Sequence, residues 1–469
     1  MVRDLKWLVI LLIGITLMYG LHSLDLDIPT GIKFAGYLII LGVTGEILRK
    51  EYGLDGSYGL ILLKTQRGLA IIDRIAKRYK DILSFGADVS LVWGFGLYGI
   101  YLLYKNLKHD VGYVLRVGII GLFLLVITVM FISPYIYPLS ASVITGVNLH
   151  KNTQTMISTL EDSPILSNIM HGLMTIILIG FGLVGHTLLS LIMFGIIVVY
   201  NVILILLGAN VEPVEPGGTL LLPGVNLPLI EGIIALIILL VVHETSHGLL
   251  SRIAKVKLLS GGIVVFGFVP VGAFIEPDED ELKHKKDIER TRVMVAGPGA
   301  NLYTMMIGFL ILIAFLNLTT NYRETGVFVV GGNLPEGAKI LEINNIKITP
   351  ENIHNLSFAP NQRVIIKTDK GEFTRITDEE GKIGFYYTVY DNHSIIPKYS
   401  NIWLTFIFRT LALVIILNFL VGVINLIPVP GLDGYHILEI NLKNKILMKT
   451  ITYLTIISFV LAFLPWLFK

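Results

Sequence analysis

The chain contains no cysteine among its 469 residues. Disulfide bonds and thiolate metal ligands are therefore excluded, so any metal ion would have to be held by other side chains, such as histidine and carboxylates. Charge is also scarce, because 15% of the residues are charged whereas 54% are hydrophobic, and the mean hydropathy is +0.73. This composition excludes a soluble enzyme and predicts a polytopic membrane protein.

The sequence also lacks the pattern of a nucleic-acid-binding surface. The formal net charge is +2, and the Lys and Arg residues cluster between apolar runs instead of alternating with aromatic residues. No nucleic-acid partner is expected from this pattern.

Ten apolar runs are long enough to cross a hydrocarbon core of about 30 Å. They cover residues 6–24, 32–48, 84–104, 117–138, 169–186, 188–208, 229–251, 293–317, 402–424 and 450–468. The first run has no small-residue cleavage site after it, so we expect a retained membrane helix and not a removed signal peptide. The fifth and sixth runs form one apolar stretch, divided on length alone at Gly185 and His186, and His186 is expected to be a turn or packing histidine.

Two loops, residues 49–83 and 252–292, are rich in Lys and Arg. By the positive-inside rule, both loops are expected in the cytoplasm. The number of membrane crossings between them must then be even, but five predicted segments lie between them. We therefore expect that one of the five segments is wrong or re-entrant.

The apolar run at residues 232–250 contains an HExxH motif formed by His243, Glu244 and His247. On a helix the two histidines lie one turn apart on one face and can bind the same ion, while Glu244 lies on the flank, where HExxH metalloproteases have their general base. A chance match is expected in roughly one chain of this length in a hundred. Charged and polar side chains in a membrane helix cost about 2.5 to 3.5 kcal/mol each and persist mainly where they line a site, which favours a functional motif.

The stretch that follows, residues 256–277, is apolar but interrupted by Gly and Pro. This pattern argues against a helix and predicts a β-hairpin. Such backbone at membrane depth is tolerated where it lines a cavity or is buried in protein. An exposed strand edge beside the metal could pair with an extended substrate, and the alternative is a hydrophobic plug that only packs.

Residues 322–392 contain short β-rich runs separated by Gly, Pro, Asn and Asp turns. They predict a small soluble β domain, inserted between a helix that ends near Leu316 and one that begins near Ile402. A passive spacer loop is the alternative, but so long a patterned segment is unusual for a spacer.

A catalytic zinc ion takes three protein ligands and leaves one position open. Two candidates for the missing ligand, Asp433 and His436, lie in NLIPVPGLDGYH, directly after the apolar run 402–424. Asp433 is a carboxylate among turn residues at the end of a membrane segment. It could bind the metal ion. Alternatively, it could lie there only because the end of the segment is exposed to water.

Three motifs together resemble one known family. HETSHG, AGPGAN at residues 296–301 and NLIPVPGLDG match, in the same order, the HExxH, GPxxN and NxxPxPxxDG patterns of the site-2 protease family of intramembrane zinc metalloproteases. The stretches PGVNLPLIEGIIALIILLVVHETSHG and GAFIEPDEDEL are similar to its archaeal branch, and the β insertion resembles the PDZ domain of many members. The resemblance covers residues 220–469; upstream, only LLKTQRGLAIIDRIAKRYK is similar.

The resemblance implies one catalytic Zn²⁺ ion, with His243, His247 and Asp433 as its ligands and Glu244 as the catalytic base. Asn301 and Asn425 are candidate supporting residues, and Asn301 could hydrogen-bond near the metal; for both, an interhelical hydrogen bond is at least as good an explanation. The chain departs from the family at Tyr435, where a second Gly is common, and in LPEGAKILEINNIKI, which is shorter than the corresponding PDZ stretch.

The predicted fold is a polytopic α-helical membrane protein with a small inserted β-rich, PDZ-like domain. Residues 1–210 form N-terminal transmembrane helices with the basic cytoplasmic loop 49–83. Residues 220–320 and 400–469 form the two parts of the protease membrane core, separated by the β domain at 322–392.

The predicted function is hydrolysis of peptide bonds within or next to transmembrane segments of membrane-protein substrates, as in regulated intramembrane proteolysis. The partners are transmembrane substrates and the lipid bilayer, and the sequence assigns no oligomeric state. We expect a multi-pass protein of the cell membrane with its site toward the cytoplasm, because the motif lies about 20 Å along its helix, shortly before Arg252, Lys255 and Lys257. The alternative is a non-enzymatic metal transporter or peptide-binding scaffold, since polar residues in membrane helices also mark ion paths.

Overall fold

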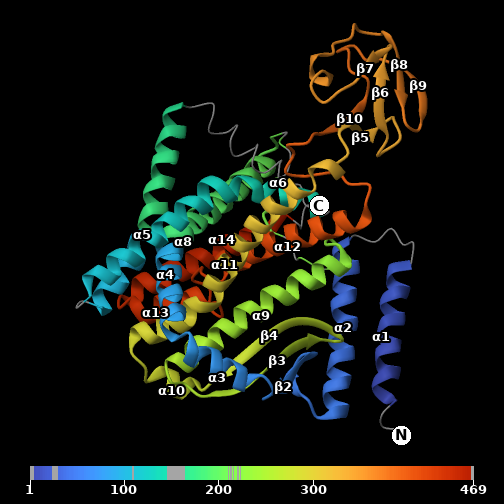
Figure 1. Cartoon of the computed structure of the whole chain (residues 1–469). Coiled ribbons are helices and arrows are strands. Elements are labelled where there is room, and N and C mark those ends of the chain that lie inside the picture. Colours follow the sequence, from blue (N-terminus) through green and yellow to red (C-terminus); the bar gives the residue numbers. More distant parts are fainter. Residues whose placement is uncertain are drawn as a thin grey trace.

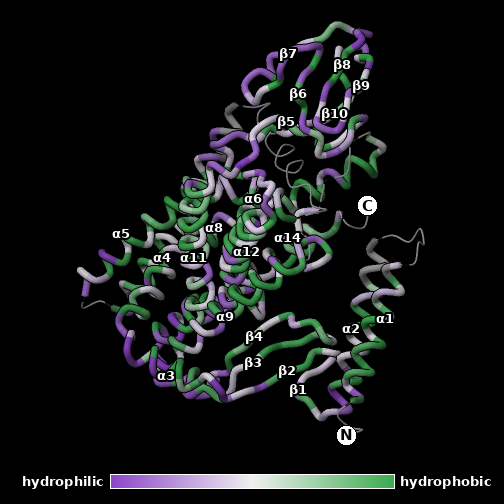
Figure 2. The backbone as a smooth tube through the Cα atoms, turned by 45° about the vertical axis from the view of Figure 1, so that its right-hand side comes forward, coloured by the Kyte–Doolittle hydropathy of each residue, from purple (hydrophilic) through white to green (hydrophobic). Residues whose placement is uncertain are grey.

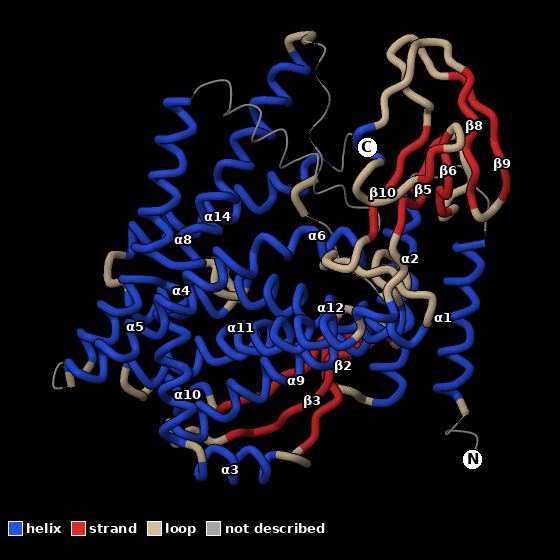
Figure 3. The backbone as a smooth tube through the Cα atoms, turned by 45° about the horizontal axis from the view of Figure 1, so that its top comes forward, coloured by secondary structure: helices blue, strands red, loops and turns tan. Residues whose placement is uncertain are grey.

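The computed structural model describes residues 5–23, 30–107, 110–144, 164–209 and 223–465, together with 211, 214, 216–218 and 221. These residues form a body of long helices, a four-stranded sheet on one side of the body and a second β-sheet at its other end (Figure 1). Figure 3 shows the two sheets well separated from each other.

Seven described helical segments are long and apolar enough to span a membrane. They are α4 (Lys80–Asn106), the continuous segment Val111–Val143, α8 (Pro164–Leu206), α9 (Leu229–Ile253), α11 (Asp287–Leu318), α12 (Ile402–Ile424) and α14 (Lys445–Phe463). The segment Val111–Val143 consists of α5 (Val111–Ile127), the π-helical turn η1 (Thr128–Ile132) and α6 (Ser133–Val143). Two further helices, α1 (Lys6–Ser23) and α2 (Thr30–Tyr52), precede them. Figure 2 shows hydrophobic positions concentrated along the helices, as expected for a polytopic membrane protein.

Each predicted run overlaps one of these helices. The first two runs lie in α1 and α2, which are not among the seven described segments long and apolar enough to span a membrane, so a membrane crossing by these two runs stays a prediction. The runs 169–186 and 188–208 are one helix, α8, so the predicted division at Gly185 and His186 is wrong. The apolar stretch contains no polar turn at which the chain could leave the membrane, and the helix bends instead at Gly182, which has φ 63°. His186 lies half-buried within α8 and not in a turn. Leu24 and residues 466–468, the ends of two predicted runs, lie outside the described residues.

The bend at Gly182 meets a second bend, at Gly96 of α4, which has φ 58°. A Cβ atom at Gly96 would lie 2.7 Å from the backbone nitrogen of Gly182, and one at Gly182 would lie 2.6 Å from the backbone nitrogen of Gly96. The two helices therefore cross backbone to backbone, which only glycine permits at these positions.

Because α8 is a single helix, four described apolar segments separate the two basic loops: α4, Val111–Val143, α8 and α9. The even number agrees with the requirement from the positive-inside rule. Strand pairing supports the same conclusion, because β2 (Leu60–Thr65) of the first loop pairs with β3 (Leu258–Phe266) of the second. The two loops therefore lie on the same side of the helical body.

The four-stranded sheet has the order β1-β2-β3-β4, where β1 spans Asp55–Ser57 and β4 spans Val269–Pro277. β3 and β4 form an antiparallel hairpin with Gly267, at φ 67°, in its turn. The predicted hairpin at 256–277 is therefore confirmed. β4 is an edge strand of this sheet and packs against α9, the helix that carries the HExxH motif.

The inserted β domain lies between α11 and α12, as predicted. Its strands are β5 (Gly326–Gly332), β6 (Lys339–Ile343), β7 (Ile346–Lys347), β8 (Arg363–Thr368), β9 (Gly371–Ile376) and β10 (Phe385–Tyr390). The sheet order is β10-β5-β6-β8-β9, with β7 paired to β6, and it has a hydrophobic core of its own. Every residue from 326 to 390 is described, and the helical element there is the short 3₁₀ turn Ile353–Asn355. The resemblance to a PDZ domain stays a prediction.

Candidate active site

The two histidines of the HExxH motif meet inside the helical body. The Nε2 atoms of His243 and His247 are 3.1 Å apart, and both rings are largely buried. The Nδ1 atom of His247 lies 2.7 Å from the main-chain oxygen of Val293 in α11, and a carbonyl oxygen can only accept. His247 therefore carries a proton on Nδ1 and turns its other ring nitrogen, Nε2, toward His243.

Asp433 reaches the same place from a different part of the chain. After α12 ends, residues 425–432 turn back, and α13 (Asp433–Asn441) begins with this aspartate. The amide of Gly434 donates to the main-chain oxygen of Asn425 at 2.7 Å and closes the turn. A Cβ atom at Gly434 would overlap the carbonyl group of Leu426, so the turn requires glycine at this position. The closed turn directs the carboxylate of Asp433 at the two histidines.

The spacing of the three side chains fits a metal ion. Oδ2 of Asp433 lies 3.3 Å from Nε2 of His243 and 3.4 Å from Nε2 of His247. Ligand atoms about 2.0–2.1 Å from a tetrahedral zinc ion are about 3.3–3.4 Å from one another. Within the described residues, His243, His247 and Asp433 form the group of histidine and carboxylate side chains with metal-ligand spacing. Two imidazoles and one carboxylate are a donor set that catalytic zinc sites use.

Glu244 lies beside this group and is not part of it. Its Oε2 atom accepts a hydrogen bond from the backbone amide of Ile275 in β4 at 3.1 Å. Ile275 is paired in register with Gly261 of β3, yet its amide points to Glu244, so this side of β4 is the free edge of the sheet. The edge strand and the carboxylate are therefore in direct contact.

Gly297 of α11 also belongs to the site. From the sequence, this glycine was expected only to let helices approach closely. A Cβ atom there would lie 2.6 Å from Nε2 of His243 and closer still to Nε2 of His247. The absence of a side chain at Gly297 therefore leaves room for the tips of both imidazoles. The glycines of the AGPGAN motif indicated close helix packing here, but the motif did not show that the neighbouring groups are the two histidine rings.

Asn301 is fully buried and contacts the site from the next turn of α11. Its Nδ2 atom lies 3.0 Å from Nδ1 of His243, and its Oδ1 atom has no partner. Turning the amide by 180° would let Oδ1 accept from an Nδ1–H group, the arrangement that a histidine binding metal through Nε2 requires. Asn425, the other predicted supporting residue, contributes its main-chain carbonyl to the closing turn.

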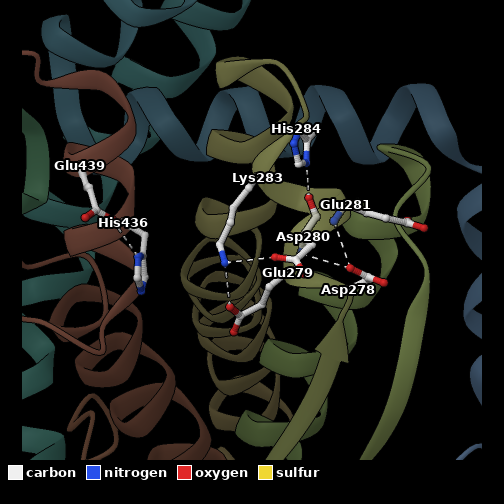
Figure 4. Close-up of polar contacts among 8 residues, drawn as sticks. All are labelled: Asp278, Glu279, Asp280, Glu281, Lys283, His284, His436 and Glu439. Atoms are coloured by element: carbon white, nitrogen blue, oxygen red, sulfur yellow. Dashed lines mark hydrogen bonds and ion pairs between the residues drawn. The ribbon is translucent and has the colours of Figure 1, made fainter.

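His436, the alternative third ligand, does not join the group. Its side chain is exposed, and its Nδ1 atom lies 3.4 Å from Glu439 on the same helix (Figure 4). Tyr435, the departure from the family pattern, is half-buried and packs against the hydrophobic core.

Figure 4 also shows an acidic turn at the start of α10 (Glu279–Lys283). Asp278 caps this helix by accepting from the amides of Asp280 and Glu281, and Lys283 pairs with Glu279 and Asp280. These contacts account for the cluster as a capped and solvated helix end.

Comparison with known proteins relates the chain to a family and to a relative. Residues 231–465 match the sequence profile of peptidase family M50. An uncharacterised protein from the archaeon Methanocaldococcus jannaschii is 30% identical over 219 residues, which is 45% of this chain and 57% of the relative. The chain thus spans little more than half the length of that relative. The profile match contains all three motifs and every residue of the histidine and aspartate group.

Proposed function

The chain belongs to peptidase family M50, the site-2 protease family, and from this premise we propose that it is a zinc metalloendopeptidase that cleaves membrane proteins within or next to their transmembrane segments. It is a multi-pass membrane protein, with seven described segments long and apolar enough to cross a bilayer. The observation that carries the proposal is the metal-ligand spacing of His243 and His247, on the membrane helix α9, and Asp433, at the start of α13.

The three ligands have distinct tasks in this proposal. A bound zinc ion would act as a Lewis acid toward the scissile carbonyl and make a nearby water more acidic. Asp433 supplies the negative charge of the donor set, and the Val293 carbonyl holds His247 in the tautomer that leaves Nε2 bare. Asn301 would likewise accept from Nδ1 of His243 and leave Nε2 of that ring available to the metal ion.

Glu244 is the proposed general base. It would take a proton from the attacking water and return it to the leaving amine. Its carboxylate is held by the amide of Ile275, so an incoming group that accepts from this amide would release Glu244 for proton transfer.

The substrate segment would bind in an extended form along β4. A helix in lipid keeps its carbonyl groups bonded internally, so the segment must unwind before hydrolysis. An unwound segment has unpaired backbone groups, and the free edge of β4 offers partners for them by strand addition. Helix-breaking residues near the cut are expected for this reason.

We propose that the site faces the cytoplasm of a cell membrane. His243 and His247 lie in the second half of α9, close to the end from which the two basic loops extend. The β domain lies at the opposite end of α11, across the helical body (Figure 1). It would select substrates on the other side of the membrane, by size or by a freed terminus.

The test combines zinc content with cleavage of a model transmembrane substrate. The native chain should bind about one zinc ion and cleave, Glu244→Gln should bind zinc without cleaving, and Asp433→Ala should lose both properties. Cleavage by Glu244→Gln would remove this residue as the base. Metal transport into vesicles by purified protein without any peptidase activity would favour the transporter instead.

A further inference from the structure

A buried ion pair joins α4 to α11 near the beginning of both helices. The side chain of Asp88 is 0% exposed and that of Arg292 is 20% exposed. The guanidinium binds the carboxylate through two parallel hydrogen bonds, from Nε to Oδ1 at 2.7 Å and from Nη2 to Oδ2 at 2.6 Å. The hydroxyl of Tyr113 in α5 donates a third bond to Oδ2 at 2.7 Å. Donors from two other helices therefore satisfy both oxygens of Asp88.

Stability alone does not explain this pair. Taking two charges out of water costs several kcal/mol per ion, and apolar replacements of buried ion pairs are often as stable as the pair. Ionisable residues inside membrane helices are expensive and mark functional positions. The proposed mechanism uses neither residue, and Asp88 and Tyr113 lie outside the matched interval 231–465.

The partner helix α11 carries three groups that touch the zinc ligands. Val293 accepts from His247, Gly297 faces both Nε2 atoms, and Asn301 contacts His243. These residues are four apart and lie on one face of the helix. A rotation or shift of α11 would therefore displace all three contacts at once.

The bond from Arg292 to Asp88 lies directly beside the first of these groups, because Arg292 precedes Val293 in the chain. A second bond fixes the helix further along, where the hydroxyl of Tyr303 donates to the main-chain oxygen of Gly86 at 3.0 Å. Arg292 and Tyr303 are eleven residues apart, or about 16 Å along the helix. The two bonds hold α11 against α4 over the same stretch that faces the histidines.

We propose that Asp88, Arg292 and Tyr113 form a positioning site that sets the rotation of α11 and so keeps the Val293 carbonyl on His247. The rigid, two-pronged guanidinium fixes orientation as well as distance, which a lysine ammonium does not. The helices α4 and α5, which lie outside the interval matched to the family, thus help to build the metal site. This inference rests on the proposed zinc site.

The test measures zinc affinity of the full chain in lipid nanodiscs by competition with a chelator. Arg292→Lys keeps the charge but loses the paired bonds, and Asp88→Asn keeps the shape but loses the charge. Both should weaken zinc binding about 10- to 100-fold, as outer-shell substitutions of metal ligands do. Because the residues act as one unit, the double variant should lose no more than the worse single variant.

The matched control is Arg49→Lys. Arg49 also binds a carboxylate through Nε and Nη2, that of Glu46 in α2, at 3.0 and 2.7 Å. The same substitution there should leave zinc affinity unchanged. A second readout needs no metal: amide hydrogen exchange of residues 291–297 in zinc-free protein should speed up in Arg292→Lys and stay at the native rate in Arg49→Lys.

A further double variant, Asp88→Leu with Arg292→Met, distinguishes loss of folding from loss of positioning. It removes both buried charges together, so neither is left unpaired in the folded protein. This variant should keep the melting temperature of the zinc-free chain and still release zinc faster. Native zinc affinity in folded variants of Asp88 and Arg292 would overturn the inference and leave the proposed function intact. Absence of zinc binding by the native chain would instead overturn the proposed function and, with it, the inference.

Discussion

Glu244 and Ile275 are joined by a hydrogen bond from the backbone amide of Ile275 to Oε2 of Glu244, at 3.1 Å. The candidate base is thereby tied to the free edge of β4, where an extended substrate would pair. A substrate carbonyl that takes over this amide would bind and release the base in one step. Under the proposed function, strand addition and proton transfer would therefore be coupled at a single backbone group.

Replacing Ile275 with proline tests this coupling, because proline removes the amide hydrogen and is tolerated in an edge strand whose N–H faces outward. We expect Ile275→Pro to keep its zinc ion and to lose roughly 2- to 10-fold in kcat/KM, since the hydrogen bond from this amide to a substrate carbonyl would contribute about 0.5–1.5 kcal/mol. Ile275→Val keeps the amide and most of the packing and should cleave at the native rate. Higher activity in Ile275→Pro would mean that the amide only restrains the base and does not bind substrate.

Gly297→Ala should weaken metal binding. The added methyl group would lie 2.6 Å from Nε2 of His243, so the rings must move apart or α11 must shift. Overpacking of this kind costs about 1–3 kcal/mol, and we expect zinc affinity to fall roughly 10- to 100-fold with a matching loss of cleavage. The control is Gly180→Ala in α8, where a Cβ atom meets nothing within 4 Å. Equal zinc affinity in the two variants would show that the imidazoles do not bind metal through Nε2.

Asn301 should act through His243. Asn301→Ala removes the partner of Nδ1 and should lower zinc affinity about 10-fold or more, whereas Asn301→Asp keeps an acceptor oxygen and should retain most of it. Asn317→Ala is the control, because this exposed asparagine of α11 bonds to the carbonyl oxygen of Ile313 and lies far along the helix from the site. Similar losses in the alanine and aspartate variants would mean that Asn301 serves only to pack the helices.

The sequence predicted the parts of the site that depend on local geometry. His243 and His247 are four residues apart, and helical periodicity alone brings them to one face. Asp433 is different. The residues alone left three explanations open, namely Asp433 as the third ligand, Asp433 as a solvated carboxylate, and His436 as the ligand. The family resemblance then favoured Asp433. The position of Asp433 depends on the closed turn from Asn425 to Gly434, and residue spacing alone does not predict the hydrogen bond that closes this turn.

The fold departs from the prediction where distant segments meet. The bend of α8 at Gly182 depends on its contact with Gly96, since a lone glycine in an apolar run has no distinctive signal. The pairing of β2 with β3 joins strands almost two hundred residues apart, and no local pattern specifies such a partner. Asp88 and Arg292 were missed as a pair for the same reason, since 204 residues separate them.

The two segments that connect the β domain to the helical body are bonded to each other, which suggests where the domain can be deleted. Arg323 donates to the main-chain oxygens of Leu316, Asn392 and Ser394, so the two connecting segments are held together below the domain. Deleting residues 326–390 beyond these bonds should preserve zinc binding and cleavage of a trimmed substrate, and should allow long substrates to be cleaved as well. Unchanged discrimination between long and trimmed substrates would contradict a role for the domain in selection.

The arrangement of the chain across the membrane can be tested by cysteine labelling, because the native chain has no cysteine. Lys77→Cys in α3 (Leu69–Arg78) and Lys283→Cys in α10 report on the two basic loops, and Glu380→Cys reports on the β domain. In intact cells, an impermeant maleimide should label Glu380→Cys alone, and the other two variants should react only after permeabilisation. The pairing of β2 with β3 requires Lys77→Cys and Lys283→Cys to behave alike whichever way the protein is inserted. Labelling of one without the other would contradict the four-crossing arrangement, whereas labelling of both in intact cells would reverse the proposed orientation and place the zinc ligands toward the outer surface.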